Sequence, residues 1–124
     1  MRERIYRVVG SVLKLVKGIE WRTAGLGDAR DQLVRAATSI GANYIEAIAA
    51  TTTNEFSRFI GHSLRSANET QYWLHLIEEN IDGSKTSGIT EIKNEVIQLS
   101  KILATSIKTM RTNTFIKKNI FTQQ

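Results

Sequence analysis

The chain has 124 residues, 41% of them apolar and 23% charged, which fits one globular domain with a single core. It contains no cysteine, which excludes disulfide bonds and thiolate metal sites, and no proline, which favours helices over a turn-rich β fold. Its apolar runs are too short to cross a membrane, so we expect a soluble protein without a membrane partner. The absence of cysteine suits the reducing cytoplasm, which is the expected location.

The first predicted helix runs from about Arg2 to Glu20, and it lacks the uninterrupted apolar stretch of a signal peptide. Its apolar residues recur every three or four positions, as they do on the buried side of a helix: Ile5, Val8, Val9, Val12, Leu15, Val16 and Ile19. Basic residues occupy the opposite side, namely Arg4, Arg7, Lys14 and Lys17.

The second predicted helix, from about Ala29 to Ala50, is small or apolar on two sides. One side carries an apolar stripe, and the other carries Ser39, Ala42 and Ala49. A helix without a solvating side is usually buried all round, so we expect a second subunit to cover it. The alternative is an exposed alanine-rich surface, because exposed alanine costs little.

The third predicted helix begins at a capping-box pattern, Thr52 to Glu55, and stops near Gly83. Tyr72 and Leu76 lie opposite its apolar stripe, and Trp73 lies at the flank. These three residues are interpreted as part of the same subunit interface, although scattered apolar residues also occur on ordinary surfaces.

The fourth predicted helix starts after Ser87 and carries a basic side formed by Lys93, Lys101, Lys108 and Arg111. Four amphipathic helices with short connections predict an all-α fold, an antiparallel up-down four-helix bundle over residues 1–112. Residues 113–124 have no clean apolar period and are interpreted as a C-terminal tail.

The net charge of +5 is concentrated on the first and fourth helices. Because these helices are neighbours in an up-down bundle, their basic sides could merge into one surface that binds RNA or DNA phosphates. The alternative is a solvated face that only keeps the protein soluble, and both interpretations remain open.

Residues that could support catalysis are scarce. The only two histidines, His62 and His75, are thirteen positions apart, too far for a shared metal ion on one helix. No glycine-rich phosphate loop or nucleophile set is present. We therefore expect a non-enzymatic protein with no metal or other cofactor.

A resemblance to a known family rests on two segments. Residues 31–47, DQLVRAATSIGANYIEA, are similar to the signature of the 23S rRNA intervening-sequence proteins, and two stretches within residues 55–77, 55–64 and 69–77, resemble the third helix of that family. The family's usual glycine after Glu-Ala is Ile48 here. The signature positions that carry over are Arg35, Asn43, Glu46 and Glu69, which we interpret as structural or interface residues.

The resemblance implies a bacterial cytoplasmic four-helix bundle that assembles as a homopentameric ring and has no enzymatic activity. A related branch serves as the accessory protein of diversity-generating retroelements and binds nucleic acid and a reverse transcriptase. The expected function is a homo-oligomeric helical scaffold with a basic surface that binds nucleic acid. The alternative is a protein-interaction module that binds no nucleic acid.

Overall fold

Four α-helices and no strands make up the part of the chain that the structure, a computed structural model, describes: residues 1–22, 25–83 and 87–122. The helices are α1 (Arg2–Gly18), α2 (Leu26–Ala49), α3 (Thr53–Asn80) and α4 (Ser87–Thr122). Side-chain positions are described for all these residues except 87 and 114–122. The all-α, four-helix prediction is confirmed, and most helix ends lie within one turn of those predicted.

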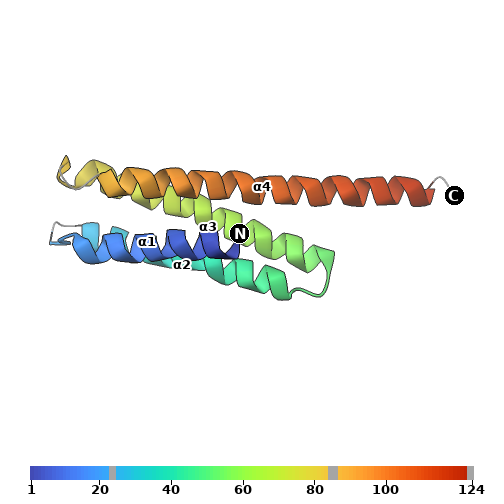
Figure 1. Ribbon diagram of the computed structural model, residues 1–124, viewed down its shortest axis with the longest axis horizontal. Helices are drawn as coiled ribbons and strands as arrows, with labels where there is room; N and C mark the ends of the chain where they lie inside the picture. Colours follow the sequence, from blue (N-terminus) through green and yellow to red (C-terminus); the bar gives the residue numbers. More distant parts are fainter. Residues whose placement is uncertain (23–24, 84–86, 123–124) are drawn as a thin grey trace.

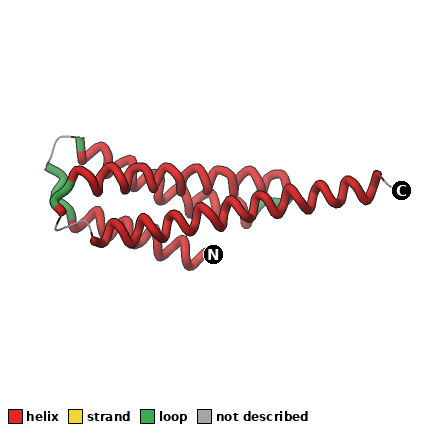
Figure 2. Tube along the Cα trace, turned by 90° about the horizontal axis from the view of Figure 1, so that it is seen from above, coloured by secondary structure: helices red, strands yellow, loops and turns green. Residues whose placement is uncertain are grey.

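The four helices lie side by side along a common long axis (Figure 1). The end of α1 and the start of α2 lie at the same end of the bundle as the end of α3 and the start of α4, whereas α2 and α3 connect at the other end. Figures 1 and 2 both show the N-terminus beside the middle of the molecule and α4 continuing past the other three helices.

The core takes apolar side chains from every helix at the predicted helical spacing. Its largest fully buried residues are Ile5, Val12, Leu33, Ile40, Ile60, Leu74, Ile77, Ile89, Val96, Leu99 and Leu103. Helices α2 and α3 form the most extensively packed pair, and α1 and α4 the least extensively packed of the neighbouring pairs. The bundle is therefore centred on α2 and α3, with α1 at its periphery.

The start of α3 is fixed by the predicted capping box. Thr52 Oγ1 accepts a hydrogen bond from the Glu55 backbone N–H at 3.1 Å, and the Glu55 carboxylate accepts one from the Thr51 N–H at 3.3 Å. These bonds satisfy N–H groups that no helical carbonyl can reach at a helix start. The capping interaction is confirmed, with Thr51 as the second partner.

Two hydrogen bonds join α3 to its neighbours within the packed interior. Buried Ser63 donates its hydroxyl to the backbone carbonyl of Ile40 on α2 at 2.8 Å. Gln71 donates its side-chain N–H to Ser100 Oγ on α4 at 2.7 Å. Because a buried polar group needs a partner, each bond favours one relative position of the helices that it joins.

Residues 113–122 belong to α4 and continue its helix. The domain boundary predicted at residue 112 stays a prediction, and residues 123–124 lie outside the described residues. No helix in the described ranges combines the length and hydropathy of a membrane span.

Candidate nucleic-acid interface

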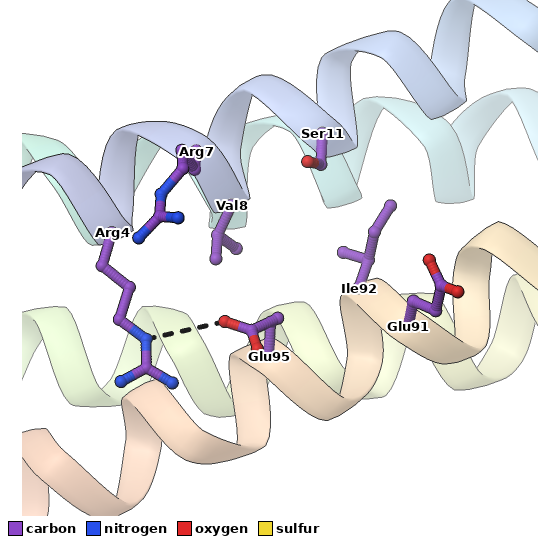
Figure 3. A pocket seen from close by; sticks show the side chains of 7 residues that line it. All are labelled: Arg4, Arg7, Val8, Ser11, Glu91, Ile92 and Glu95. Atoms are coloured by element: carbon purple, nitrogen blue, oxygen red, sulfur yellow. Dashed lines mark ion pairs between the residues drawn. The ribbon is translucent and has the colours of Figure 1, made fainter.

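The predicted basic surface of α1 and α4 contains a groove that we call the α1–α4 groove, with a cavity of about 220 Å³ (Figure 3). The residues that line it are Arg4, Arg7, Val8, Ser11, Glu91, Ile92 and Glu95. Val8 and Ile92 form its apolar part, whereas the polar residues carry charges of both signs. Helices α1 and α4 are thus neighbours, but their shared groove is not uniformly basic.

Arg4 is held by α4 within the same subunit. Its Nε lies 3.5 Å from Glu95 Oε2, the ion pair drawn in Figure 3, and its guanidinium donates to the side-chain carbonyl of Gln98. A cation paired in this way has less charge to offer a phosphate. The sequence prediction of Arg4 as a phosphate ligand missed these partners because they are more than ninety positions away in the chain.

Lys93 is likewise engaged within the subunit, on the other side of α4. Its Nζ lies 2.9 Å from Glu78 Oε1 on α3, and Thr90 donates to the same carboxylate at 2.9 Å. The hydrogen bond from Lys93, with that from Thr90, lowers the pKa of Glu78 below its ordinary value. Lys93 therefore serves the α3–α4 contact rather than the open surface.

The other six predicted phosphate ligands are exposed, namely Arg7, Lys14, Lys17, Lys101, Lys108 and Arg111. They come from two helices and do not share one cavity. Arg7 lines the α1–α4 groove, Lys101 lines an apolar cavity with Phe56, and Arg111 lines a third cavity between α3 and α4. This third cavity differs from the others in its charge.

A cavity of about 440 Å³ lies between the first half of α3 and α4, and we call it the arginine groove. Its lining residues are Asn54, Ser57, Arg58, Gly61, His62, Arg65, Ile107 and Arg111. Arg58, His62 and Arg65 follow one another at intervals of four and three residues, which places them on one side of α3. Arg111 faces them from α4, so both helices contribute cations.

The arginine groove combines three guanidinium groups with an imidazole, an amide and a hydroxyl, and its lining contains no aspartate or glutamate. The Arg58 guanidinium carbon lies 4.9 Å from the centroid of the half-buried Phe59 ring, a cation–π contact. A guanidinium carries five N–H donors, so Arg58 can also donate hydrogen bonds to a ligand in the groove. The groove is suited chemically to an anion with several oxygen acceptors.

A smaller cavity of about 290 Å³ adjoins the arginine groove at the start of α3. Three residues line both cavities: Asn54, Ser57 and Arg111. All three can donate hydrogen bonds, and they lie beside the N-terminal end of α3, where the helix dipole favours negative charge. The part of the groove that these three donors line is therefore the best suited to bind an anion.

Sequence reasoning missed Arg58, Arg65 and His62 as members of a basic site. Their spacing on α3 was a usable signal, since positions 58, 62 and 65 must share one side of a helix. Counting charge over the whole helix concealed it, because Glu69, Glu78 and Glu79 follow in the second half of α3. The net negative charge of α3 therefore comes from its second half.

The sequence matches the model of a known protein family. Residues 5–105 match the family model described as 23S rRNA-intervening sequence protein. The chain belongs to this family. The resemblance drawn from residues 31–47 and 55–77 is confirmed, whereas comparison with curated proteins gives no match.

A solved structure agrees with the family assignment. The chain is similar, at 28% sequence identity and a TM-score of 0.74, to a protein of unknown function from the S23 ribosomal protein family of Bacteroides thetaiotaomicron. The alignment covers 86% of this chain and 97% of that chain. The likeness therefore extends over nearly the whole of the crystallised bundle.

The residues predicted to form a subunit interface in this family member lie on the surface of the single chain or near it. Ala42, Ala49 and Tyr72 are exposed, and Ser39, Trp73 and Leu76 are half-buried. Tyr72 is 58% exposed, and its ring meets that of Trp73 edge to face with centroids 4.8 Å apart. Sequence reasoning did not include Ile48, Leu13 and Tyr6, which are also exposed.

Within the described part of one subunit, no hydrogen bond or ion pair joins the four family signature residues to one another. Arg35, Glu46 and Glu69 are exposed, and Asn43 is half-buried. Asn43 donates to the Ser39 carbonyl at 2.9 Å, and Glu69 accepts from Trp73 Nε1 at 3.3 Å. Pairing among these residues across subunits stays a prediction.

Proposed function

We propose that this member of the 23S rRNA-intervening sequence family is a non-enzymatic scaffold that binds nucleic acid through phosphate groups in the arginine groove. The observation that carries the proposal is the lining of that groove, with three guanidinium groups and no carboxylate. Arginine presents its N–H donors in a fork that fits phosphate oxygens. The net charge of +5 and the exposed Lys101 and Lys108 on α4 would attract the strand around this point.

Gly61 supports the same use of the groove. It lies inside α3, where glycine costs about 0.8–1.0 kcal/mol relative to alanine. A Cβ atom at this position would meet no atom within 4 Å, so packing within the subunit does not require glycine. A Cβ would, however, enter the arginine groove, which Gly61 lines. Glycine at this position therefore leaves more room in the groove for a ligand.

We also propose that antiparallel up-down bundles assemble into a homopentameric ring in the bacterial cytoplasm, as the family resemblance implied. Exposed Tyr72 beside Trp73 on α3 and the exposed small residues Ala42 and Ala49 on α2 support self-association, because a second subunit could cover them. A ring would repeat the arginine groove in every subunit, so that weak phosphate contacts add up to avid binding. A protein partner at the Tyr72 surface is the second candidate.

The decisive experiment is filter binding of a single-stranded RNA and a duplex DNA over a series of salt concentrations. Affinity for both should fall steeply with salt and depend little on base sequence. The variant Arg58→Glu/Arg65→Glu should weaken binding and should lower the log–log salt slope by about 0.7 for each lost contact to single-stranded RNA. Lys14→Glu/Lys17→Glu should have a smaller effect, since these residues lie outside the groove.

A matched control separates the groove from overall charge. Arg2→Glu/Arg22→Glu changes the net charge by the same amount at two exposed positions outside the groove. A second pair separates space from charge: Gly61→Leu fills the groove, whereas Gly10→Leu adds the same side chain to α1. Equal weakening by both arginine pairs would refute the groove as the site, and no RNA or DNA retention at low salt would leave the protein-interaction function.

A further inference from the structure

We infer that the arginine groove recognises the terminal phosphate of a nucleic-acid strand, a phosphomonoester, in preference to the internal phosphodiesters. This inference rests on the proposed function and names the chemical group that the groove takes. The observation that supports it is the positive charge around one small cavity. Arg58, Arg65 and Arg111 all line a single cavity of about 440 Å³.

Internal and terminal phosphates differ in charge and in their number of free oxygens. An internal phosphodiester carries one negative charge and two free oxygens, whereas a terminal phosphate carries about 1.5 to 2 charges at pH 7 and three free oxygens. Three guanidinium groups in the lining of one cavity exceed what a single diester charge can balance. The dianion uses more of the available donors, because each guanidinium has several N–H groups.

The shape of the site also favours a terminal phosphate. The arginine groove and the smaller cavity beside it meet at Asn54, Ser57 and Arg111, next to the first turn of α3. The amide, hydroxyl and guanidinium that line both cavities can each donate hydrogen bonds to phosphate oxygens. An internal phosphate presents strand on two sides, whereas a terminal phosphate presents it on one and leaves three oxygens for these donors. The position at a helix start adds the favourable dipole end.

The experiment compares one RNA oligonucleotide with a 5′-phosphate, a 3′-phosphate or hydroxyl groups at both ends, in binding assays with the full chain. The phosphorylated forms should bind about tenfold tighter or more, as expected for added charge-assisted hydrogen bonds. A hydroxyl-ended RNA two nucleotides longer carries a similar total charge and should bind like the shorter hydroxyl-ended RNA. This control removes any gain that comes from net charge.

Variants locate the effect. Arg111→Gln should abolish the preference for phosphorylated ends, and Ser57→Ala should reduce it. Lys108→Gln is the matched control, because Lys108 is exposed on the same helix, carries the same charge and does not line the groove. It should weaken binding of every RNA by a similar factor and keep the preference. Circular dichroism melting of each variant checks that the bundle is folded.

The outcomes separate the inference from the proposed function. Equal affinity for phosphorylated and hydroxyl-ended RNA overturns the inference, while binding to nucleic acid stands. No binding of any RNA overturns the proposed function and the inference together. If a nucleoside 5′-monophosphate binds as tightly as the phosphorylated RNA, the site takes a small molecule instead of a strand end, and the inference is also overturned.

Discussion

Ser63 on α3 forms a buried hydrogen bond to the backbone of α2. Its side chain is fully buried, and its hydroxyl donates to the Ile40 carbonyl at 2.8 Å. We expect Ser63→Ala to lower the free energy of unfolding by about 1 kcal/mol, the net contribution of an internal hydrogen bond. Urea denaturation measures it, with Ser11→Ala at an exposed position as the control. No loss of stability in Ser63→Ala would mean that the hydrogen bond does not stabilise this packing.

Glu78 should make stability depend on acid pH. Its pKa is lowered chiefly by the hydrogen bond from Lys93, so the folded protein binds a proton less readily than the unfolded chain. The stabilisation is therefore fully present above the ordinary pKa of 4.5 and is lost as pH falls through the lower pKa of the folded state. Glu78→Gln should reduce stability at neutral pH, and its difference from the wild type should shrink in acid.

Denaturation curves at neutral pH and near pH 3 test this expectation. Glu91→Gln, which removes an exposed carboxylate from α4, is the control and should show a smaller change with pH. A constant difference between wild type and Glu78→Gln across this range would show that the Glu78–Lys93 contact does not couple folding to protonation.

Contacts within one helical turn could be predicted from the sequence, whereas contacts between helices could not. The capping of α3 was predictable because Thr52 and Glu55 interact within one turn. The pairing of Arg4 with Glu95 was not, because it depends on how α1 settles against α4. Periodicity predicts which side of a helix a charged residue occupies. Whether that charge is paired with one on another helix depends on how the two helices are aligned.

At the scale of helices, glycines inside α1, α2 and α3 offer a test of packing. A Cβ at Gly10 or Gly61 meets no atom within 4 Å, and one at Gly41 lies 3.5 Å from Ile5 Cγ2, an ordinary contact. Each Gly→Ala variant should therefore stabilise the subunit by about 0.8–1.0 kcal/mol through helix propensity. Thermal denaturation measures the gain, and a loss of stability at Gly10 or Gly61 would contradict the open space described at those positions.

Helix bounds were largely predictable because each helix has a regular apolar stripe, and Gly25 and Gly83 fall between the stripes. The arginine groove was not, because its cations come from two helices and the charge of α3 changes sign along its length. Apolar periodicity did not predict that residues 113–122 continue α4, because these residues lack a clean apolar period.

At the scale of the whole molecule, self-association is the main expectation. Ala42 is exposed in the single chain, so Ala42→Glu should leave the bundle folded while placing a charge in the proposed subunit interface. Light scattering should show an oligomer for the wild type and smaller species for Ala42→Glu. Asn94→Glu adds the same side chain at an exposed position on α4 and should leave the oligomer intact.

A wild-type mass of 14.0 kDa at micromolar concentration, the mass of one chain, would rule out this assembly. Dissociation by Asn94→Glu as well as by Ala42→Glu would show that added charge, and not the position of Ala42, breaks the oligomer. In either case the arginine groove lies within one subunit, so its phosphate binding can be measured independently of assembly.

The peripheral place of α1 has a consequence for the order of folding. The best-packed pair, α2 and α3, are neighbours in the chain, so their contacts form at a small cost in loop entropy. We expect these two helices to assemble early in folding and α1 to dock late. In native-state hydrogen exchange, the amides of α1 should then open at a lower free energy than those of α3, as a cooperative unit that detaches first.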